Sequence, residues 1–154
     1  MTKLPLITIV TPSFNQGHFL EATIQSVLRQ DYPHIEYIII DGGSTDGSVA
    51  IIKKYEKHVA YWISEPDSGQ SNAINKGFAK ATGEILAWLN SDDVLMPSAV
   101  GIAAHYLTRH SANGVVYGDR LHIDAKGNII GINQCPSHNT SMFKRKYTLP
   151  QETV

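Results

Sequence analysis

Two adjacent carboxylates, Asp92 and Asp93, follow the apolar run at residues 85–89. Acidic side chains at the end of a buried strand are costly to desolvate unless positive charge lies beside them. Mg²⁺ and Mn²⁺ prefer oxygen ligands, and proteins often hold them with one or two carboxylates together with water and phosphate oxygens. The pair therefore favours a divalent metal that neutralises the charge on a departing diphosphate. The alternative is that both acids interact with the dipole of a helix that begins near Pro97.

Polar residues also follow other apolar runs. Asp41 comes after three isoleucines and before two glycines, where its carboxylate could accept a hydrogen bond from a nucleobase N–H. Because Asp-Gly is a common turn pair, an ordinary turn is the alternative. Asp67 and Gln70 flank a predicted helix start at Gly69, and helix N-termini attract anions. Gln70 is a candidate ribose or sugar contact, whereas Lys76 either reaches a phosphate or lies on a solvated helix face.

The first apolar run ends in Thr11, Pro12, Ser13, Phe14 and Asn15. Pro12 fixes its own φ and makes this connection rigid. Backbone groups here could touch a base or a ribose, with Phe14 packed against them. The alternative is a rigid connection between a strand and a helix that has no ligand contact.

Composition restricts the class of protein. The chain has 154 residues, 42% hydrophobic and 18% charged, with a formal net charge of −1. These values are typical of a globular domain and give no basic face for nucleic acid. Cys135 is the only cysteine, which excludes an internal disulfide. Because no apolar run approaches the length of a membrane span, we expect no transmembrane segment and a cytoplasmic location, either free or at the inner face of a membrane.

Strand and helix patterns alternate along the chain. Continuous apolar runs predict strands, and apolar pairs repeating every three to four residues predict helices. The predicted strands cover residues 6–10, 35–40, 59–63, 84–89 and 115–117, and the predicted helices cover 19–28, 49–55, 73–81 and 97–107.

Unbroken apolar strands that alternate with helices indicate an α/β fold, with a mostly parallel sheet flanked by helices on both faces. Ligands of such sheets bind outside the carboxyl ends of the strands, where the polar segments fall. Residues 121–123 and 128–132, on either side of a glycine-containing turn, predict a hairpin near the C-terminus. We expect one domain over residues 1–147 and a loose tail over 148–154.

Several spaced motifs, in order, resemble the inverting glycosyltransferases of family 2, which have the GT-A fold. They are ITIVTPSFN at 7–15, YIIIDGGSTDGS at 37–48, SEPDSGQ at 64–70, NKG at 75–77, GE at 83–84 and LNSDD at 89–93. The resemblance covers nearly the whole chain up to about residue 147.

The resemblance implies a nucleoside-diphosphate-sugar donor, usually linked to UDP, and Mn²⁺ or Mg²⁺ as cofactor. It implies that Asp41 contacts the base, that Pro12 and Ser13 line the nucleoside pocket, and that Asp92 and Asp93 form the metal motif. The family often has an acid where this chain has Asn90. Because Asn90 is neutral, Asp93 is the better candidate for the direct metal contact.

The resemblance also implies direct displacement by an acceptor hydroxyl, on a carbohydrate or a lipid-linked acceptor, whose proton goes to a downstream acid. Such enzymes carry that base beyond the hairpin, and only Glu152 follows Asp124 here. We therefore expect a complete donor half without the acceptor half, and no assigned base. His138 resembles an acceptor-side histidine of the family. The alternatives are a compact enzyme with another base and a non-catalytic nucleotide-sugar-binding domain. An uncovered apolar sheet face would favour a homo-oligomer.

Overall fold

The structure, a computed structural model, describes residues 4–110 and 114–135. The chain divides into two compact units, Met1–Gly114 and Val115–Val154. The predicted extent of the domain, residues 1–147, stays a prediction, and the predicted tail lies outside the described residues. Within the described ranges, no helix has both the length and the hydropathy that a membrane span requires.

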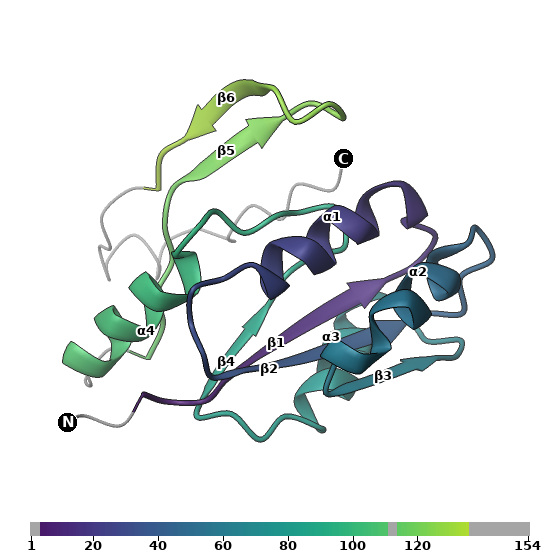
Figure 1. Ribbon diagram of the computed structural model, residues 1–154, viewed down its shortest axis with the longest axis horizontal. Helices are drawn as coiled ribbons and strands as arrows, with labels where there is room; N and C mark the ends of the chain where they lie inside the picture. Colours follow the sequence, from purple (N-terminus) through teal and green to yellow (C-terminus); the bar gives the residue numbers. More distant parts are fainter. Residues whose placement is uncertain (1–3, 111–113, 136–154) are drawn as a thin grey trace, which may run out of the picture. The chain divides into compact units, whose positions relative to one another are not determined.

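The first unit is built on a parallel sheet with the strand order β3-β2-β1-β4 (Figure 1). Every residue of the central strand β1 is buried, including Thr8, Thr11 and Ser13, which is expected for a strand that is covered on both faces. The four predicted strands of this unit are confirmed, with ends shifted by up to three residues. Their bounds are β1 Ile7–Ser13, β2 Ile35–Asp41, β3 Tyr61–Ser64 and β4 Ile85–Trp88.

Helices pack on both faces of this sheet. On one face, buried side chains of α1, α2 and α4 form a cluster with Ile9 and Ile39 of the central strands. On the other face, α3 packs against Val10, Ile38 and Ile40. The prediction of a sheet flanked on both faces is therefore confirmed. The helices are α1 Gly17–Leu28, α2 Ser48–Tyr55, α3 Gln70–Phe78 and α4 Ala99–Arg109, with a short 3-10 helix η1 at Glu56–His58.

The β4 strand exposes apolar side chains on the α3 face. Leu86 and Trp88 pair in register with Thr8 and Val10 and so project to the same face as Val10. They remain 50% and 48% exposed. Exposed apolar side chains of this kind are what the prediction of self-association requires, and self-association itself stays a prediction.

The second unit contains the predicted hairpin, which is confirmed. Strands β5 (Arg120–Ile123) and β6 (Ile129–Asn133) are antiparallel, and Asp124 accepts hydrogen bonds from the backbone N–H groups of the turn between them. The strand predicted at residues 115–117 is wrong. Val115 is 73% exposed, and residues 115–117 pair with no strand within the described part of the chain. Their apolar side chains therefore do not extend a sheet.

Candidate functional site

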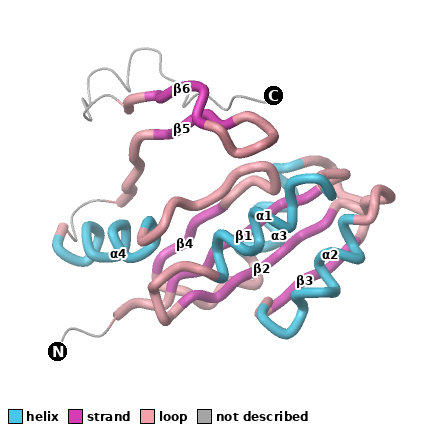
Figure 2. The backbone as a smooth tube through the Cα atoms, turned by 45° about the horizontal axis from the view of Figure 1, so that its top comes forward, coloured by secondary structure: helices cyan, strands magenta, loops and turns pink. Residues whose placement is uncertain are grey.

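The strands of the first unit end along one edge of the sheet. Ser13 pairs with Asp41, Asp41 pairs with Ser64, and the Leu89 N–H after β4 donates to the Val10 carbonyl of β1 at 2.9 Å. Because neighbouring strands lie about 4.8 Å apart, the ends of β2 and β4, on either side of β1, are separated by roughly 10 Å. This carboxyl edge collects the loops that carry the predicted site residues of the first unit (Figure 2).

Asp41 is fully buried, and both of its carboxylate oxygens are hydrogen-bonded within the protein. Oδ2 accepts from the backbone N–H groups of Gly43 at 3.1 Å and Ser44 at 2.9 Å, and from the Ser64 hydroxyl at 2.6 Å. Oδ1 accepts from the Ser44 hydroxyl at 2.5 Å. Asp41 therefore holds the loop after β2 against the end of β3. Its predicted contact with a base stays a prediction, and a base N–H would have to compete with these donors.

The loops after β1 and β2 are bonded to each other. Asn15, which has a left-handed φ of 53°, donates its N–H to the Ser44 hydroxyl at 2.8 Å, and its side-chain oxygen accepts from the Thr45 N–H at 2.9 Å. Asp46 accepts from the N–H of Gly17 at the start of α1 at 2.8 Å. Since Asn tolerates this left-handed backbone better than most residues, the sequence at this position suits the loop.

Asp46 should make the stability of the fold depend on pH at the acidic end. Hydrogen bonds from the Ser48 hydroxyl and the Gly17 N–H hold the pKa of Asp46 at about 2, below its usual 3.8. Because the folded-state pKa is the lower one, the carboxylate stabilises the fold above about pH 4, and this contribution is lost as the pH falls toward about 2. We expect urea midpoints to fall more steeply over this range for the wild type than for Asp46→Asn. Parallel pH profiles would contradict this role of Asp46.

In the predicted contact segment of the first loop, Phe14 and Asn15 are exposed, and Asn15 is bonded to the loop after β2. Phe14 is 62% exposed, whereas Thr11, Pro12 and Ser13 are buried. The Thr11 hydroxyl lies 3.0 Å from the Tyr37 hydroxyl inside the core, and burial raises the pKa of Tyr37. The Ser13 hydroxyl is buried with no hydrogen-bond partner among the described residues. Phe14 is therefore the side chain of this segment best placed to meet a ligand.

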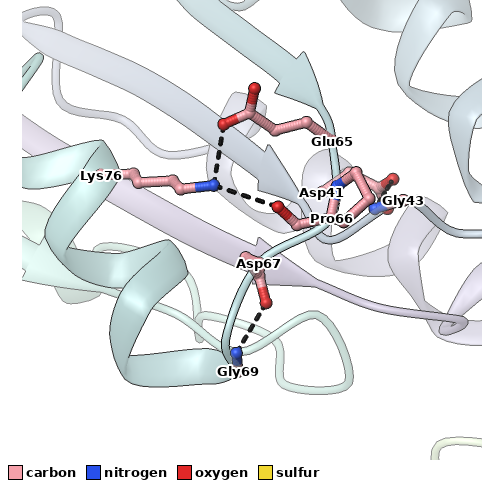
Figure 3. A network of polar contacts seen from close by, with 7 residues as sticks. All are labelled: Asp41, Gly43, Glu65, Pro66, Asp67, Gly69 and Lys76. Atoms are coloured by element: carbon pink, nitrogen blue, oxygen red, sulfur yellow. Dashed lines mark hydrogen bonds and ion pairs between the residues drawn. The ribbon is translucent and has the colours of Figure 1, made fainter.

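The loop between β3 and α3 is fixed by Lys76 (Figure 3). Its ammonium group lies 2.8 Å from a Glu65 oxygen and 3.5 Å from the Pro66 carbonyl. Further along the loop, Asp67 Oδ1 accepts from the Gly69 N–H at 2.7 Å, and Gly69 has a φ of +107°. The ammonium group of Lys76 in α3 thus binds the loop that precedes this helix, which favours a structural role over the phosphate contact considered from the sequence.

A chain of polar contacts connects the start of α3 to the acidic loop after β4. The Gln70 amide donates to the Asn90 side-chain oxygen at 2.7 Å, and the Asn90 amide donates to Asp93 Oδ2 at 3.1 Å. The Asp92 side chain is exposed beside them. Gln70 begins α3, whereas Asn90 and Asp93 belong to the loop after β4, so the fold brings two segments together.

Thr23 of α1 is hydrogen-bonded to this acidic loop, a contact that the sequence did not indicate. Its buried hydroxyl lies 2.9 Å from the Ser91 carbonyl and 2.8 Å from the Asp93 carbonyl. A neighbouring serine, Ser26, accepts from the Leu95 N–H at 3.0 Å. The sequence did show a threonine inside the apolar stripe of a predicted helix. Such a hydroxyl more often bonds to a carbonyl of its own helix, so it did not indicate a contact with a distant loop.

Asp92 and Asp93 fit a divalent cation that also binds phosphate. They are adjacent oxygen donors at the open edge of the sheet, and Asn90 contributes an amide next to Asp93. No group of three or more His, Cys, Asp or Glu side chains suited to a metal occurs within residues 4–110 and 114–135. Mg²⁺ typically binds through one or two carboxylates, with waters and substrate phosphates completing its shell. The donor set therefore suits a metal that arrives with a phosphate ligand. His138 lies outside the described residues.

Comparison of the sequence with known proteins identifies one family. The family model described as "Glycosyl transferase family 2" matches residues 8–153. A relative named "Uncharacterized glycosyltransferase", from Mycobacterium tuberculosis (strain ATCC 25618 / H37Rv), is 46% identical over 126 residues, which are 79% of this chain and 48% of the relative. The chain thus spans about half the length of that curated relative.

Solved structures share the fold. The mannosyltransferase PcManGT from Pyrobaculum calidifontis, in complex with GDP-Man and Mn²⁺, has a TM-score of 0.65 at 25% identity, over 77% of this chain and 35% of that one. A UDP complex of residues 1–349 of S. aureus TarS has a TM-score of 0.64 at 24% identity, over 69% of this chain and 33% of that one. The GT-A fold expected from the sequence motifs is confirmed.

Proposed function

The chain belongs to glycosyltransferase family 2, and we propose that it forms the donor half of an enzyme that transfers a sugar from a UDP-linked donor to an acceptor hydroxyl. The observation that carries this proposal is the chain of contacts from Gln70 through Asn90 to Asp93. These contacts bring the Gln70 amide, which we propose as the ribose or sugar contact, beside the acidic loop at the carboxyl edge. Ligands of open α/β sheets bind at this edge.

We assign the parts of the donor to the loops by their chemistry. The exposed ring of Phe14 offers a face for the base, with the backbone around Pro12 and Ser13 beside it. Asp93, with Asp92, holds Mn²⁺ or Mg²⁺, which when bound neutralises the charge of the leaving diphosphate. Gln70 contacts the ribose or the sugar. Asn90 orients Asp93 through their hydrogen bond.

The proposed reaction is a displacement with inversion at the anomeric carbon. The acceptor oxygen forms the new glycosidic bond, the bond from the anomeric carbon to the diphosphate oxygen breaks, and the acceptor proton goes to a base. No described residue is assigned as that base. The chain spans about half of its relative, so some proposals concern the whole protein. They are the base, a carbohydrate or lipid-linked acceptor, an acceptor contact by His138 and a cytoplasmic location, either free or at the inner face of a membrane.

Calorimetry with UDP tests the donor site. We expect UDP to bind in the presence of Mn²⁺ and to bind at least about tenfold more weakly in a chelator, because the metal neutralises the diphosphate beside two carboxylates. Inorganic pyrophosphate serves as the control ligand without a base. Equal UDP affinity with and without metal would contradict the metal assignment, and the lack of any nucleotide binding would contradict the proposed function.

A further inference from the structure

We propose that Asp67 is the residue that recognises the base of the donor, and that its carboxylate selects a base whose only N–H donor is one ring N–H, as in uracil. This inference rests on the proposed function and deepens it by naming the base class and the residue that reads it. Three observations carry it: the hydrogen bonds that Asp41 already accepts, the oxygen of Asp67 that accepts none, and the close approach of Asp67 to Phe14 over Gly42.

Asp41 has little capacity left for a ligand. Its side chain is fully buried, and its two oxygens already accept four hydrogen bonds from Gly43, Ser44 and Ser64. A carboxylate has about four lone-pair sites in total. A base N–H that replaced one of these donors would also loosen the loop after β2. A second acid at the same edge is therefore the better acceptor.

Asp67 is that acid. Its Oδ1 accepts from the Gly69 N–H at 2.7 Å, whereas its Oδ2 makes no hydrogen bond within the described part of the chain. Figure 3 shows the Asp67 carboxylate directed to the Gly69 backbone and turned away from Lys76, so no nearby ammonium group occupies it. The bond to Gly69 holds the carboxylate in place before any ligand binds.

Asp67 and Phe14 approach each other closely over Gly42, which has no Cβ to separate them. A Cβ at position 42 would lie 3.1 Å from Asp67 Oδ2 and 3.3 Å from Cδ2 of Phe14. Asp67 and Phe14 therefore flank the same point, although 53 positions separate them along the chain. Since Phe14 is 62% exposed, its ring offers a stacking face next to an acceptor. A flat ring with an N–H on its edge matches this pair.

The hydrogen-bonding character of the Asp67 carboxylate determines which bases fit. An ionised carboxylate only accepts hydrogen bonds. Uracil presents a ring N–H between two carbonyls, whereas cytosine presents an acceptor nitrogen at that position and would be repelled. Guanine presents two adjacent N–H donors and calls for two acceptors, but one Asp67 oxygen is already bonded to Gly69. Sites built to bind a substrate N–H discriminate strongly against analogues that lack it.

The test is a change of base preference in Asp67→Asn. The asparagine keeps an oxygen for the Gly69 N–H and replaces Oδ2 with an amide N–H donor, which suits cytosine. Calorimetry with UDP, CDP and GDP in Mn²⁺ measures the preference. We expect the wild type to prefer UDP. In Asp67→Asn, the affinity for UDP should fall by about 10- to 100-fold, while the affinity for CDP stays the same or rises. GDP should remain weak in both proteins.

Two further variants sharpen the result. Glu65→Gln changes an acid of the same loop that pairs with Lys76, and it should leave the ratio of UDP to CDP affinity unchanged. Gly42→Ala places a methyl group 3.1 Å from Asp67 Oδ2 and 3.3 Å from Phe14 Cδ2, so one of these side chains must shift. It should weaken UDP binding while leaving Mn²⁺-pyrophosphate binding unchanged. If the wild type binds UDP and Asp67→Asn leaves the ratio unchanged, the inference is wrong and the proposed function stands. If the wild type binds no nucleoside diphosphate, both are wrong.

Discussion

Asp93→Ala is expected to remove the metal dependence of UDP binding. Gln70 donates a hydrogen bond to Asn90, and Asn90 donates one to the carboxylate of Asp93. These two hydrogen bonds orient Asp93. Loss of a residue that only orients a metal ligand typically costs 10- to 100-fold in metal affinity or activity, so we expect loss of the ligand itself to cost about 100-fold or more. Calorimetric titration of UDP with and without Mn²⁺ should give the same weak affinity for this variant.

The matched control is Glu84→Ala, which removes an exposed acid at the opposite end of the same strand. It should bind UDP like the wild type in Mn²⁺ and in chelator. The metal dependence of UDP binding in Asp92→Ala should lie between those of Asp93→Ala and Glu84→Ala. Full metal dependence in Asp93→Ala would contradict the assignment of Asp93, and an equal loss in Glu84→Ala would show that the effect comes from net charge.

Gly77→Ala is expected to destabilise the fold, although alanine is the better helix former. A Cβ at this position of α3 would lie 2.4 Å and 2.8 Å from the two methyl carbons of Val10 in the central strand. Valine is stiff at χ1 and is packed in the sheet, so it has little room to move. Overpacking of this kind costs about 1–3 kcal/mol and outweighs the helix-propensity gain of about 1 kcal/mol. Urea denaturation measures the change in the free energy of unfolding.

Gly101→Ala is the matched control, because it also lies within a helix but has only Asp31 Oδ1, at 3.7 Å, within contact range. It should stabilise the fold by about 0.5–1 kcal/mol. In a Val10→Ala background, the cost of Gly77→Ala should shrink, which would give a coupling free energy of about 0.5–3 kcal/mol. Equal effects at both glycines would mean that α3 does not approach the sheet as closely as described.

The sequence predicted the elements whose formation depends on local patterns. Unbroken apolar runs located β1 to β4, and the turn around Gly127 located the hairpin. The carboxyl-edge rule then predicted that the loops bearing Asp41 and Asp93 would emerge along one edge, because parallel strands joined by helices all end on the same side. The register confirms this for the strands that carry them.

The details that depend on distant partners could not be read from the sequence. The Asp-Gly pair at residues 41–42 could have been a turn or a ligand contact, and only the positions of Ser44 and Ser64 reveal that Asp41 already accepts hydrogen bonds on both oxygens. Thr23 contacts residues 68 and 70 positions away. The apolar run at 115–117 matched a strand pattern, but a strand forms only where a neighbouring strand accepts its hydrogen bonds.

We propose that the ends of β1, β2, β3 and β4 form a single site for a metal-bound nucleoside diphosphate. Amide NMR spectra of the labelled chain, recorded with UDP and substoichiometric Mn²⁺, test it most directly because the paramagnetic ion broadens nearby signals. We predict broadening of residues 90–93 and of Gln70 first, then Gly42 and Asp67, with the opposite edge at Glu36 and Gly83 unaffected. Broadening at Glu36 and Gly83, or uniform weak broadening without a focus at 90–93, would contradict the account.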